Sequence, residues 1–333
     1  MNIQMQFTSL KDVRRKKKKK WPRVLIDVIV VIFVLVNGIG LYFGNILYKQ
    51  AFEINTKEEL DQYEKNKLTF NEKRYSELEK EDVSVASKHN YRLYGTFIKN
   101  AKSTKDTIIL LHGIGGSRWT VMKYLDMYLD KGFNVLIYDS RNHGSSKGDN
   151  VTYGFYEKDD LDKWVEWVYK NNKGGVIGVH GDDIGAATSL LHSKMNEAKK
   201  RVSFYISDSS YSDLSDFFTY KFKKVYDTKY GLFLKPLIFY MDKVNKLKNG
   251  FYLNEVSPIN ILKDVKTPIM FISGSEDSDL PESMSEDMYK IKEGIKKIYI
   301  APNSGHCEAF LNNPDEYTDK VYEFIDSSMK KNN

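Results

Sequence analysis

Four loops of the sequence carry residues whose types suit hydrolysis. Residues 112–116 (HGIGG) are rich in glycine, so their backbone N–H groups can point at an oxyanion that develops during a reaction. Residues 181–185 (GDDIG) hold a carboxylate, Asp183, at the centre of a pattern bounded by glycines. Asp277 and His306 follow much later in the chain. A nucleophile, an acid and a histidine in this order predict a catalytic triad assembled from separate loops.

Most of these loops follow a short apolar run, which predicts a strand that ends where the loop begins. The predicted strands of this kind cover residues 107–111, 135–138, 175–180, 202–207, 269–272 and 298–300. Helical patterns lie between most of them, and two alternating segments, 82–87 and 91–99, precede them as an antiparallel pair. Strand–helix alternation is typical of a mostly parallel sheet with helices on both faces, so we expect an α/β fold whose site lies at the carboxyl ends of the strands.

One connection is too long for a simple loop. Roughly 55 residues, rich in Tyr and Phe, separate the strand that ends near Asp208 from the strand that starts at Pro268, and a structureless loop of that length is improbable in a compact domain. We therefore expect a helical cap over residues 211–262, inserted into a domain that covers residues 81–333. Tyr220 and Tyr240 are candidates to polarise a substrate oxygen, although packing is the commoner role of such side chains.

The net charge of +6 is concentrated at the N-terminus. Residues 1–23 carry nine basic residues against one acid, Asp12, which leaves a net charge of −2 for the rest of the chain. A nearly neutral body gives no reason to expect a nucleic acid as partner. We interpret residues 1–23 as a basic arm on the cytoplasmic side of a membrane.

A long apolar run follows the basic arm directly. Residues 24–48 are long enough to cross a hydrocarbon core of about 30 Å. The positive residues before this span favour a signal-anchor helix in the cell membrane, with a cytoplasmic N-terminus and an extracellular body. Residues 49–80 are charged and helix-compatible and would form a stalk. The alternative is a signal peptide cleaved near residues 38–40 (GIG), but the run stays apolar beyond that point, which favours the uncleaved anchor.

From about residue 82 to residue 330, the chain resembles the membrane-anchored bacterial α/β-hydrolases of the serine aminopeptidase-like branch. The stretches that carry the resemblance are LLHGIGGSRW, NVLIYDSRNHGSSKG, YGFYEKDDLDKWVEWV, GVHGDDIGAAT and EVSPI, together with the Asp277 and His306 motifs. The resemblance implies an α/β-hydrolase fold, with oxyanion donors from the backbone near Ile114 and from Ile184. It also implies that Asp277 is the acid and His306 the base of a hydrolase triad.

The chain departs from this family at the nucleophile. Where the family has Gly-Glu-Ser-Met-Gly, residues 181–185 read Gly-Asp-Asp-Ile-Gly. A carboxylate is ionised at neutral pH without help from a base, and a helix N-terminus favours its charge further. Attack by Asp183 on an ester carbonyl would give a reactive anhydride, whereas attack on a saturated carbon gives a stable aspartyl ester. Water activated by His306 can then hydrolyse that ester, with the new oxyanion held by backbone N–H groups.

Two groups that share the fold, haloalkane dehalogenases and epoxide hydrolases, work in this way. The resemblance to them is incomplete, because a dehalogenase is expected to have Trp at the position of Ile184, and epoxide hydrolases tend to have Pro in the motif at residues 112–116. The substrate class is therefore a small ester, amide or alkyl electrophile. The alternative is an inactive homologue: Asp tolerates the positive φ of an elbow, so Asp183 can preserve the backbone while the chemistry is lost. Such a protein would be an extracellular binding module.

The remaining candidate residues suit structural roles. His143 is expected in a turn after a strand, His180 in the core, and Cys307 as a small buried side chain, and as the only cysteine it cannot form a disulfide within the chain. Asp159 and Asp160 are expected at a helix start. We find no spacing typical of metal ligands and expect neither a metal nor another cofactor. The expected partners are a small-molecule substrate and, through the N-terminal helix, a membrane, and the sequence carries no signal for oligomeric state.

Overall fold

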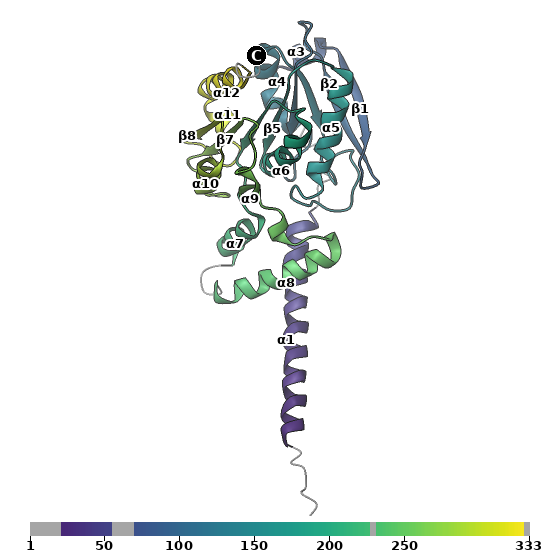
Figure 1. Ribbon diagram of the computed structural model, residues 1–333, viewed down its shortest axis with the longest axis vertical. Coiled ribbons are helices and arrows are strands. Elements are labelled where there is room, and N and C mark those ends of the chain that lie inside the picture. The colour runs from purple at the N-terminus through teal and green to yellow at the C-terminus, as the bar shows by residue number, and fades with distance from the viewer. Residues whose placement is uncertain (1–20, 55–69, 227–230, 330–333) are drawn as a thin grey trace, which may run out of the picture.

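A central sheet of eight strands organises the protein, which we describe from a computed structural model over residues 21–54, 70–226 and 231–329 (Figure 1). The strand order is β1-β2-β4-β3-β5-β6-β7-β8. The strands are β1 (Lys80–Ala86), β2 (Arg92–Ile98), β3 (Thr107–Leu111), β4 (Asn134–Tyr138), β5 (Ile177–Asp182), β6 (Phe204–Asp208), β7 (Ile269–Gly274) and β8 (Lys296–Ala301). Strand β2 runs antiparallel to β1 and β4, and β3 to β8 run parallel. The predicted mostly parallel sheet, opened by an antiparallel pair, is confirmed.

Helices cover both faces of this sheet. Successive residues of each strand point to opposite sides, so a strand that is apolar throughout has apolar side chains to bury on both faces. In β3, Ile108 and Leu110 pack in one apolar cluster with α12 (Pro314–Met329), α4 (Leu125–Lys131) and the short 3-10 helix η2 (Thr120–Tyr124). Ile109 and Leu111 pack in another cluster with α5 (Glu157–Asn171), α6 (Ile184–Lys199) and α10 (Ser283–Ile291). A strand buried on both faces is expected to be apolar throughout, as β3 is.

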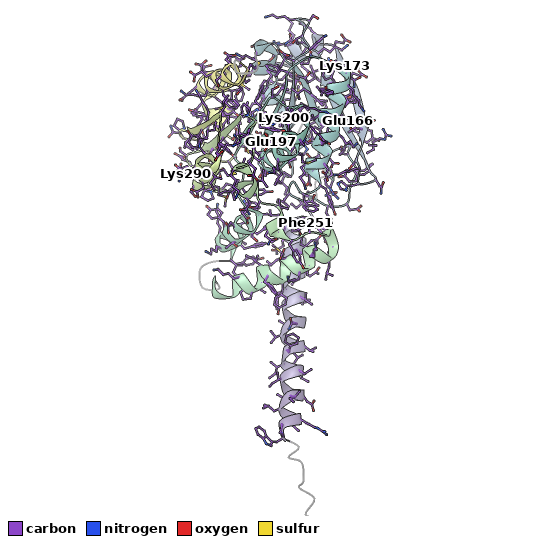
Figure 2. The ribbon with its side chains drawn as sticks, in the orientation of Figure 1. Glu166, Lys173, Glu197, Lys200, Phe251 and Lys290 are labelled. Carbon is purple, nitrogen blue, oxygen red and sulfur yellow. The ribbon has the colours of Figure 1, made fainter. Side chains whose placement is uncertain are left out.

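The long connection between β6 and β7 forms a helical cap. It contains α7 (Leu214–Val225), α8 (Gly231–Asn249), the 3-10 helix η4 (Leu253–Glu255) and α9 (Pro258–Leu262). Buried side chains of α7 and α8 form a third apolar cluster together with Ile184, the first residue of α6. Phe251, which follows α8, belongs to the same cluster and lies at the junction of cap and body (Figure 2).

One helix within the described ranges, α1 (Trp21–Phe52), is long and apolar enough to cross a membrane. Its most apolar 18-residue window has a mean hydropathy of 2.8, and its first part projects from the body with exposed side chains (Figure 2). Its last two turns are buried in the cap cluster instead, through Leu47, Tyr48, Ala51 and Phe52. The apolar helix is therefore longer than the predicted span of residues 24–48 and ends inside the folded body.

Helix α8 crosses α1 at very short range. The two glycines Gly40 and Gly44 face Tyr240 of α8, and a Cβ atom at Gly44 would lie 2.6 Å from the backbone carbonyl carbon of Tyr240. Small residues spaced by four let two helices approach this closely. The Tyr240 hydroxyl also donates a hydrogen bond to Asn37 Oδ1 at 3.2 Å.

Parts of the predicted organisation lie outside the described residues. These are most of the basic arm, residues 1–20, and the middle of the stalk, residues 55–69. Of the stalk range, residues 49–52 belong to α1, and the short helix α3 (Glu72–Glu77) covers part of the rest. A further short helix, α11 (Ala309–Asn312), follows the loop that carries His306.

Candidate active site

A sharp turn between β5 and α6 presents Asp183 at the carboxyl edge of the sheet. The residue has φ 52° and ψ −116°, a positive-φ conformation outside the left-handed helical region that is strained for a residue with a side chain. The glycines on either side are required by close contacts: a Cβ at Gly181 would lie 2.3 Å from the backbone of Gly185, and one at Gly185 would lie 2.7 Å from Leu111 O. The predicted strand–turn–helix geometry is present, and the whole turn is positioned by its neighbours β3 and β6.

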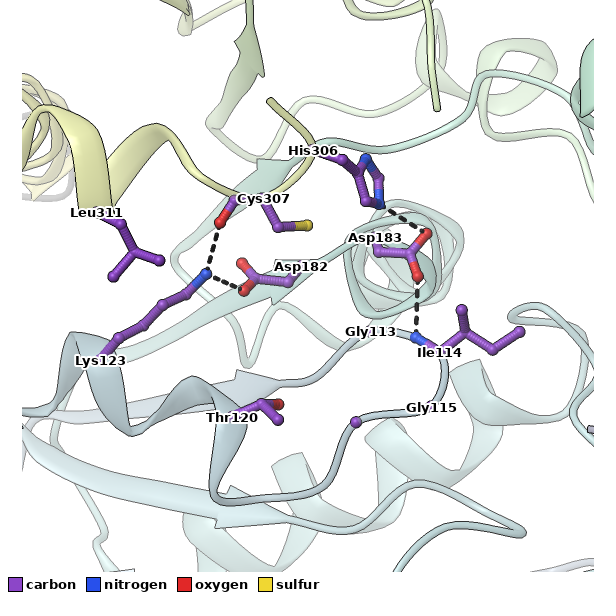
Figure 3. A pocket seen from close by; sticks show the side chains of 11 residues that line it. Gly113, Ile114, Gly115, Thr120, Lys123, Asp182, Asp183, His306, Cys307 and Leu311 are labelled. Carbon is purple, nitrogen blue, oxygen red and sulfur yellow. Dashed lines mark hydrogen bonds and ion pairs between the residues drawn. The ribbon is translucent and has the colours of Figure 1, made fainter. Parts of the chain in front are cut away.

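The two carboxylate oxygens of Asp183 face different partners (Figure 3). Oδ2 accepts a hydrogen bond from the backbone N–H of Ile114 at 2.9 Å, and Oδ1 lies 3.6 Å from Nε2 of His306. Ile184 opens α6 directly after Asp183, so its N–H is among those that a helix leaves without an intrahelical acceptor. The structure thus brings the glycine-rich loop, the elbow and the late histidine to one place.

His306 is oriented by Asp277 from its other side. Nδ1 of His306 lies 2.8 Å from Asp277 Oδ2, and the Asp277 side chain is fully buried. The other oxygen, Oδ1, accepts hydrogen bonds from the backbone N–H groups of Asp279 and Leu280 at 2.8 and 2.9 Å. Because Asp277 accepts a hydrogen bond from the Nδ1–H group of His306, Nε2 is the nitrogen directed at Asp183.

Two carboxylates hold His306 in its charged form. Burial alone would lower the pKa of the imidazole, but the nearby carboxylates of Asp183 and Asp277 outweigh burial and raise that pKa well above its ordinary value. The resting site therefore contains an imidazolium between two carboxylates. A serine at position 183 would lack this negative charge, so the aspartate changes the protonation state of His306.

Two further histidines form hydrogen bonds that hold the glycine-rich loop in place. His112 accepts a hydrogen bond at Nε2 from Ser140 N–H and makes a contact of 2.7 Å through Nδ1 with Gly113 O. His143 accepts at Nε2 from Gly115 N–H at 3.2 Å. Burial lowers the pKa of His112 to about 3 and lowers that of His143 as well, so both rings are neutral and each can accept one of these hydrogen bonds. His143 occupies the expected turn, and that turn supports the glycine-rich loop.

Lys123 is a component of the site that sequence reasoning missed. Its Nζ forms an ion pair with Asp182 Oδ2 at 2.9 Å and donates to Cys307 O at 2.9 Å, which ties the residue before Asp183 to the residue after His306 (Figure 3). Burial works to lower the pKa of Lys123, but the carboxylate of Asp182 outweighs it and the net pKa is raised. The sequence offered one indication of a buried lysine, which is that Lys123 lies among the apolar residues of η2.

Beneath the elbow lies the group of described residues that comes closest to a metal site. His180, Asp182 and Asp208 are buried, and their ligand atoms lie within 4.8 Å of one another. Their polar atoms already have protein partners: His180 contacts the hydroxyls of Tyr128 and Tyr317, and Asp208 accepts from Tyr317 at 2.9 Å. Asp182 is paired with Lys123, so a cation from the protein already neutralises the group. These residues fit a hydrogen-bonded network better than a metal.

The pocket above Asp183 has a volume of about 310 Å³. It is lined by the glycine-rich loop, by the elbow and by the loop of His306, and Leu311 supplies part of its apolar wall. Cys307 also lines it; burial raises the pKa of this thiol to about 12, which makes it a poor nucleophile. The volume suits a small molecule.

The cap tyrosines considered as substrate ligands are engaged elsewhere. The Tyr220 hydroxyl donates to Ser278 O at 3.1 Å, and the hydroxyl of Tyr240 donates to α1. Both side chains therefore fasten the cap to its surroundings, which is the packing role that the sequence favoured for them. Asp159 and Asp160 lie in the first turn of α5, at a helix start as expected.

Comparisons with known proteins agree with this architecture. The sequence profile of the "alpha/beta hydrolase fold" family matches residues 106–237. The uncharacterized protein YqkD of Bacillus subtilis is 35% identical over 254 residues, which cover 76% of this chain and 81% of that protein.

Solved structures extend the comparison. The esterase Pf2001 from Pyrococcus furiosus has a TM-score of 0.60 and 25% identity, covering 78% of this chain and 96% of the esterase. The acylaminoacyl peptidase of Pyrococcus horikoshii shares the fold with a TM-score of 0.55 and 20% identity, covering 75% of this chain and 41% of the peptidase. With the sheet order, the elbow and these matches together, the chain belongs to the α/β hydrolase family.

Proposed function

We propose that this protein is a hydrolase that opens a small alkyl electrophile through a covalent ester on Asp183. The observation that supports this proposal best is that the two carboxylate oxygens of Asp183 have different partners. Oδ2 accepts from Ile114 N–H, where the oxyanion of a later step must lie, while Oδ1 faces His306. Asp277 orients His306 for both steps.

In the first step, Oδ1 of Asp183 attacks a saturated carbon and the bond to the leaving group breaks. His306 begins this step as an imidazolium, so it can give its proton to a leaving oxygen. An epoxide benefits most from such a group, because ring opening produces an alkoxide that needs a proton. The products are a neutral hydroxyalkyl ester of Asp183 and a neutral His306.

In the second step, water cleaves the ester at the Asp183 carbonyl carbon. Esterification removes the negative charge that kept His306 protonated, so the pKa of His306 falls and its Nε2 can take a proton from water. The carbonyl oxygen is Oδ2, and the oxyanion that forms there lies on the N–H groups of Ile114 and Ile184. When the alcohol leaves with a proton, Asp183 and His306 return to their charged pair.

Esters and amides form the second substrate class, supported by the likeness to proteins named esterase and acylaminoacyl peptidase. For them, attack by Asp183 at a carbonyl would produce an anhydride. The stable ester formed from an alkyl electrophile makes better use of a carboxylate nucleophile, so we place the alkyl electrophile first.

Trapping of the ester intermediate tests the proposal. The full chain in detergent, carrying His306→Gln, is incubated with a simple aryl epoxide or a haloalkane and analysed by mass spectrometry of its peptides. We expect an adduct on the peptide that contains Asp183, formed slowly with an epoxide, because the proton donor of the first step is missing, and readily with a haloalkane, whose halide leaves without a proton. Hydrolysis stops in both cases, and no adduct forms when Asp183→Asn is added. An unmodified Asp183 in the His306→Gln protein, across aryl epoxides and haloalkanes, would refute the covalent mechanism.

A second function, an extracellular binding module, is favoured by the same ion pair. Asp183 and His306 satisfy each other at rest, which is also what an inert remnant of a serine enzyme would look like. Asp183→Ser separates the two functions. Esterase activity on aryl esters in this variant, together with a wild type inert to all electrophiles, would assign the protein to the binding class.

We also propose a location at the cell membrane, with α1 as a single uncleaved span. The basic residues before α1 support a cytoplasmic N-terminus, and the folded body then lies outside the cell. Since the end of α1 is part of the cap cluster, the membrane span and the substrate cap form one packed unit.

A further inference from the structure

A second pocket lies apart from the residues that line the Asp183 pocket. It has a volume of about 590 Å³ and is formed where the turn between β1 and β2 meets the loop after β4. The turn supplies Lys88 to Tyr91, the loop supplies Arg141 and residues 147–149, and Tyr156 closes one side. None of these residues takes part in the chemistry proposed for Asp183.

Arg141 is the unusual residue of this pocket. Only 7% of its surface is exposed, and its guanidinium lies between the rings of Tyr91 and Tyr156, at 5.1 and 4.9 Å from their centroids. Its Nε is buried and has no hydrogen-bond partner, and no carboxylate of the described chain forms an ion pair with it. A buried charge without a hydrogen-bonded counter-ion is costly, so a site that keeps one is built to receive an anion.

The nearby acids do not fill that role. Asp160 accepts hydrogen bonds from the hydroxyls of Ser87 and Tyr91, at 2.5 Å each, which occupy one oxygen apiece. Burial raises the pKa of Asp160 to about 7, which weakens it as a counter-ion. Asp159 is paired with Lys88 at 2.6 Å and with His89 at 2.9 Å.

The lining of the pocket as a whole is positive. Lys88, Arg141 and Lys147 contribute three cationic side chains, and Asp149 is the one acid among the lining residues. A planar guanidinium binds the oxygens of a phosphate or carboxylate in pairs, and its faces remain free to stack on tyrosine rings as they do here. Lys147 adds a point charge to Arg141, whereas the charge of Lys88 is already paired with Asp159.

The pocket borders the root of the membrane helix. Asn150, next to the lining residue Asp149, donates to Tyr48 of α1 at 3.1 Å and to Asn249 of α8 at 3.2 Å. The Tyr156 hydroxyl donates to Asn249 O at 2.9 Å. An anion bound beside Arg141 therefore lies close to the point where α1 enters the body.

We propose that the Arg141 pocket binds a phosphate group, carried by a membrane lipid headgroup or free in solution. Ligand oxygens replace the hydrogen bonds that the guanidinium lacks, and the stacked tyrosines hold the guanidinium in place to receive them. A phosphate bound here would fix the body relative to α1 and the membrane surface. The proposal is independent of the chemistry at Asp183, so either can fail while the other stands.

Phosphate binding to the full chain in a maltoside detergent, which carries no phosphate group, is the test. Inorganic phosphate is titrated at constant ionic strength against chloride, with thermal unfolding as the readout. We expect saturable stabilisation of the wild type and a loss of affinity of about tenfold or more in Arg141→Gln, because charge-assisted hydrogen bonds are lost. Lys147→Ala, an exposed change that keeps the pocket wall, should weaken binding by a smaller factor. Lys173→Ala removes an exposed charge outside the pocket and should bind as the wild type does.

Nanodiscs that contain an anionic phospholipid distinguish the two sources. Weaker apparent binding of inorganic phosphate in these nanodiscs identifies the headgroup as the occupant, and unchanged binding identifies a free phosphate. Phosphate that stabilises the protein no more than chloride does, or that binds Lys147→Ala and a folded Arg141→Gln as tightly as the wild type, would overturn the proposal.

Discussion

The proton on His306 is the feature at the residue scale from which the proposed chemistry follows. In a serine hydrolase, the histidine must begin as a base, because it removes the proton of the nucleophile. Asp183 needs no such help and keeps His306 protonated, so the same three positions can begin with an acid and continue with a base. In the proposed mechanism, one different residue at the elbow reorders the proton transfers while the strand–turn–helix geometry is kept.

The first prediction concerns the pH dependence of stability. The pKa of His306 is raised in the folded protein above an unfolded value near 6.5, so the contribution of its ion pairs to stability is complete below about pH 6.5 and is lost as pH rises through the folded-state pKa. Relative to His306→Gln, the wild type should therefore lose up to about 1.4 kcal/mol of unfolding free energy per pH unit above pH 6.5. Urea unfolding at several pH values between about 6 and 9 measures this, and parallel curves for the two proteins would contradict it.

The positions of Asp183, Asp277 and His306 at one edge of the sheet could be predicted because each residue follows a strand with a clear apolar pattern. Asp183, Asp277 and His306 come from loops whose positions at the sheet edge follow from the chain order of the strands. Lys123 and Arg141 could not be assigned in the same way. Their environments are created by segments far apart in the sequence, and a lone basic residue gives no indication of whether its partner is a carboxylate or a tyrosine ring.

At the scale of elements, the sheet and its connections hold the loops of the site together. The strand predicted at residues 107–111 agrees with β3, whereas β5 continues to Asp182, two residues beyond the predicted end. The difference arises because Gly181 and Asp182 pair with β6 although they are not apolar. Likewise, the glycines of α1 fit both an apolar span and a cleavage region by pattern, and their contact with α8 became visible only in the packed structure.

The second prediction compares two glycines of α1. A Cβ at Gly44 would collide with the backbone of α8, whereas a Cβ at Gly38 meets no atom within 4 Å. Gly44→Ala should therefore destabilise the packing of α8 on α1 by about 1–3 kcal/mol, and Gly38→Ala should be neutral or stabilising by up to about 1 kcal/mol. Amide hydrogen exchange in α8, in detergent, is the measurement. Equal protection of α8 in both variants would show that the two helices do not pack as described.

The third prediction concerns the ion pair that joins η2 to the end of β5. Lys123→Met leaves Asp182 buried without its cation and should cost about 3–5 kcal/mol of stability. Lys170→Met removes an exposed pair with Glu166 on α5 and should cost no more than about 0.5 kcal/mol. Denaturant unfolding of both variants tests the difference, and a similarly small loss in Lys123→Met would show that Lys123 does not hold the two segments together.

On the scale of the whole molecule, the cap connects the site to the apolar helix. The carboxyl edge of the sheet faces α7 and α8. The C-terminal end of α1 packs on the same side of the molecule, and its N-terminal part projects away from the body (Figure 1). A substrate that partitions into a membrane would therefore reach the protein on the side where the site lies. The fold class could be predicted from strand order and helix alternation, but this packing of α1 on the cap could not, because it depends on side chains more than 150 residues apart.

The fourth prediction tests the orientation of the body. Lys173 is exposed on the body, and the only native cysteine, Cys307, has a pKa raised to about 12, so it reacts slowly with maleimides (Figure 2). Lys173→Cys should be labelled by a membrane-impermeant maleimide in intact cells, and the wild type should stay unlabelled. Labelling of Lys173→Cys only after cell lysis would place the body on the cytoplasmic side.

The most direct measurement of the central claim, that Asp183 is a working nucleophile, follows the oxygen atoms of its carboxylate. The wild type is allowed to turn over an aryl epoxide in water enriched in ¹⁸O, and the peptide that contains Asp183 is then weighed. We expect heavy oxygen in Asp183, because water attacks the carbonyl carbon of the aspartyl ester and leaves its oxygen in the carboxylate. Turnover that places heavy oxygen in the product from the first cycle and none in Asp183 would show that water attacks the substrate directly, and it would contradict the covalent mechanism.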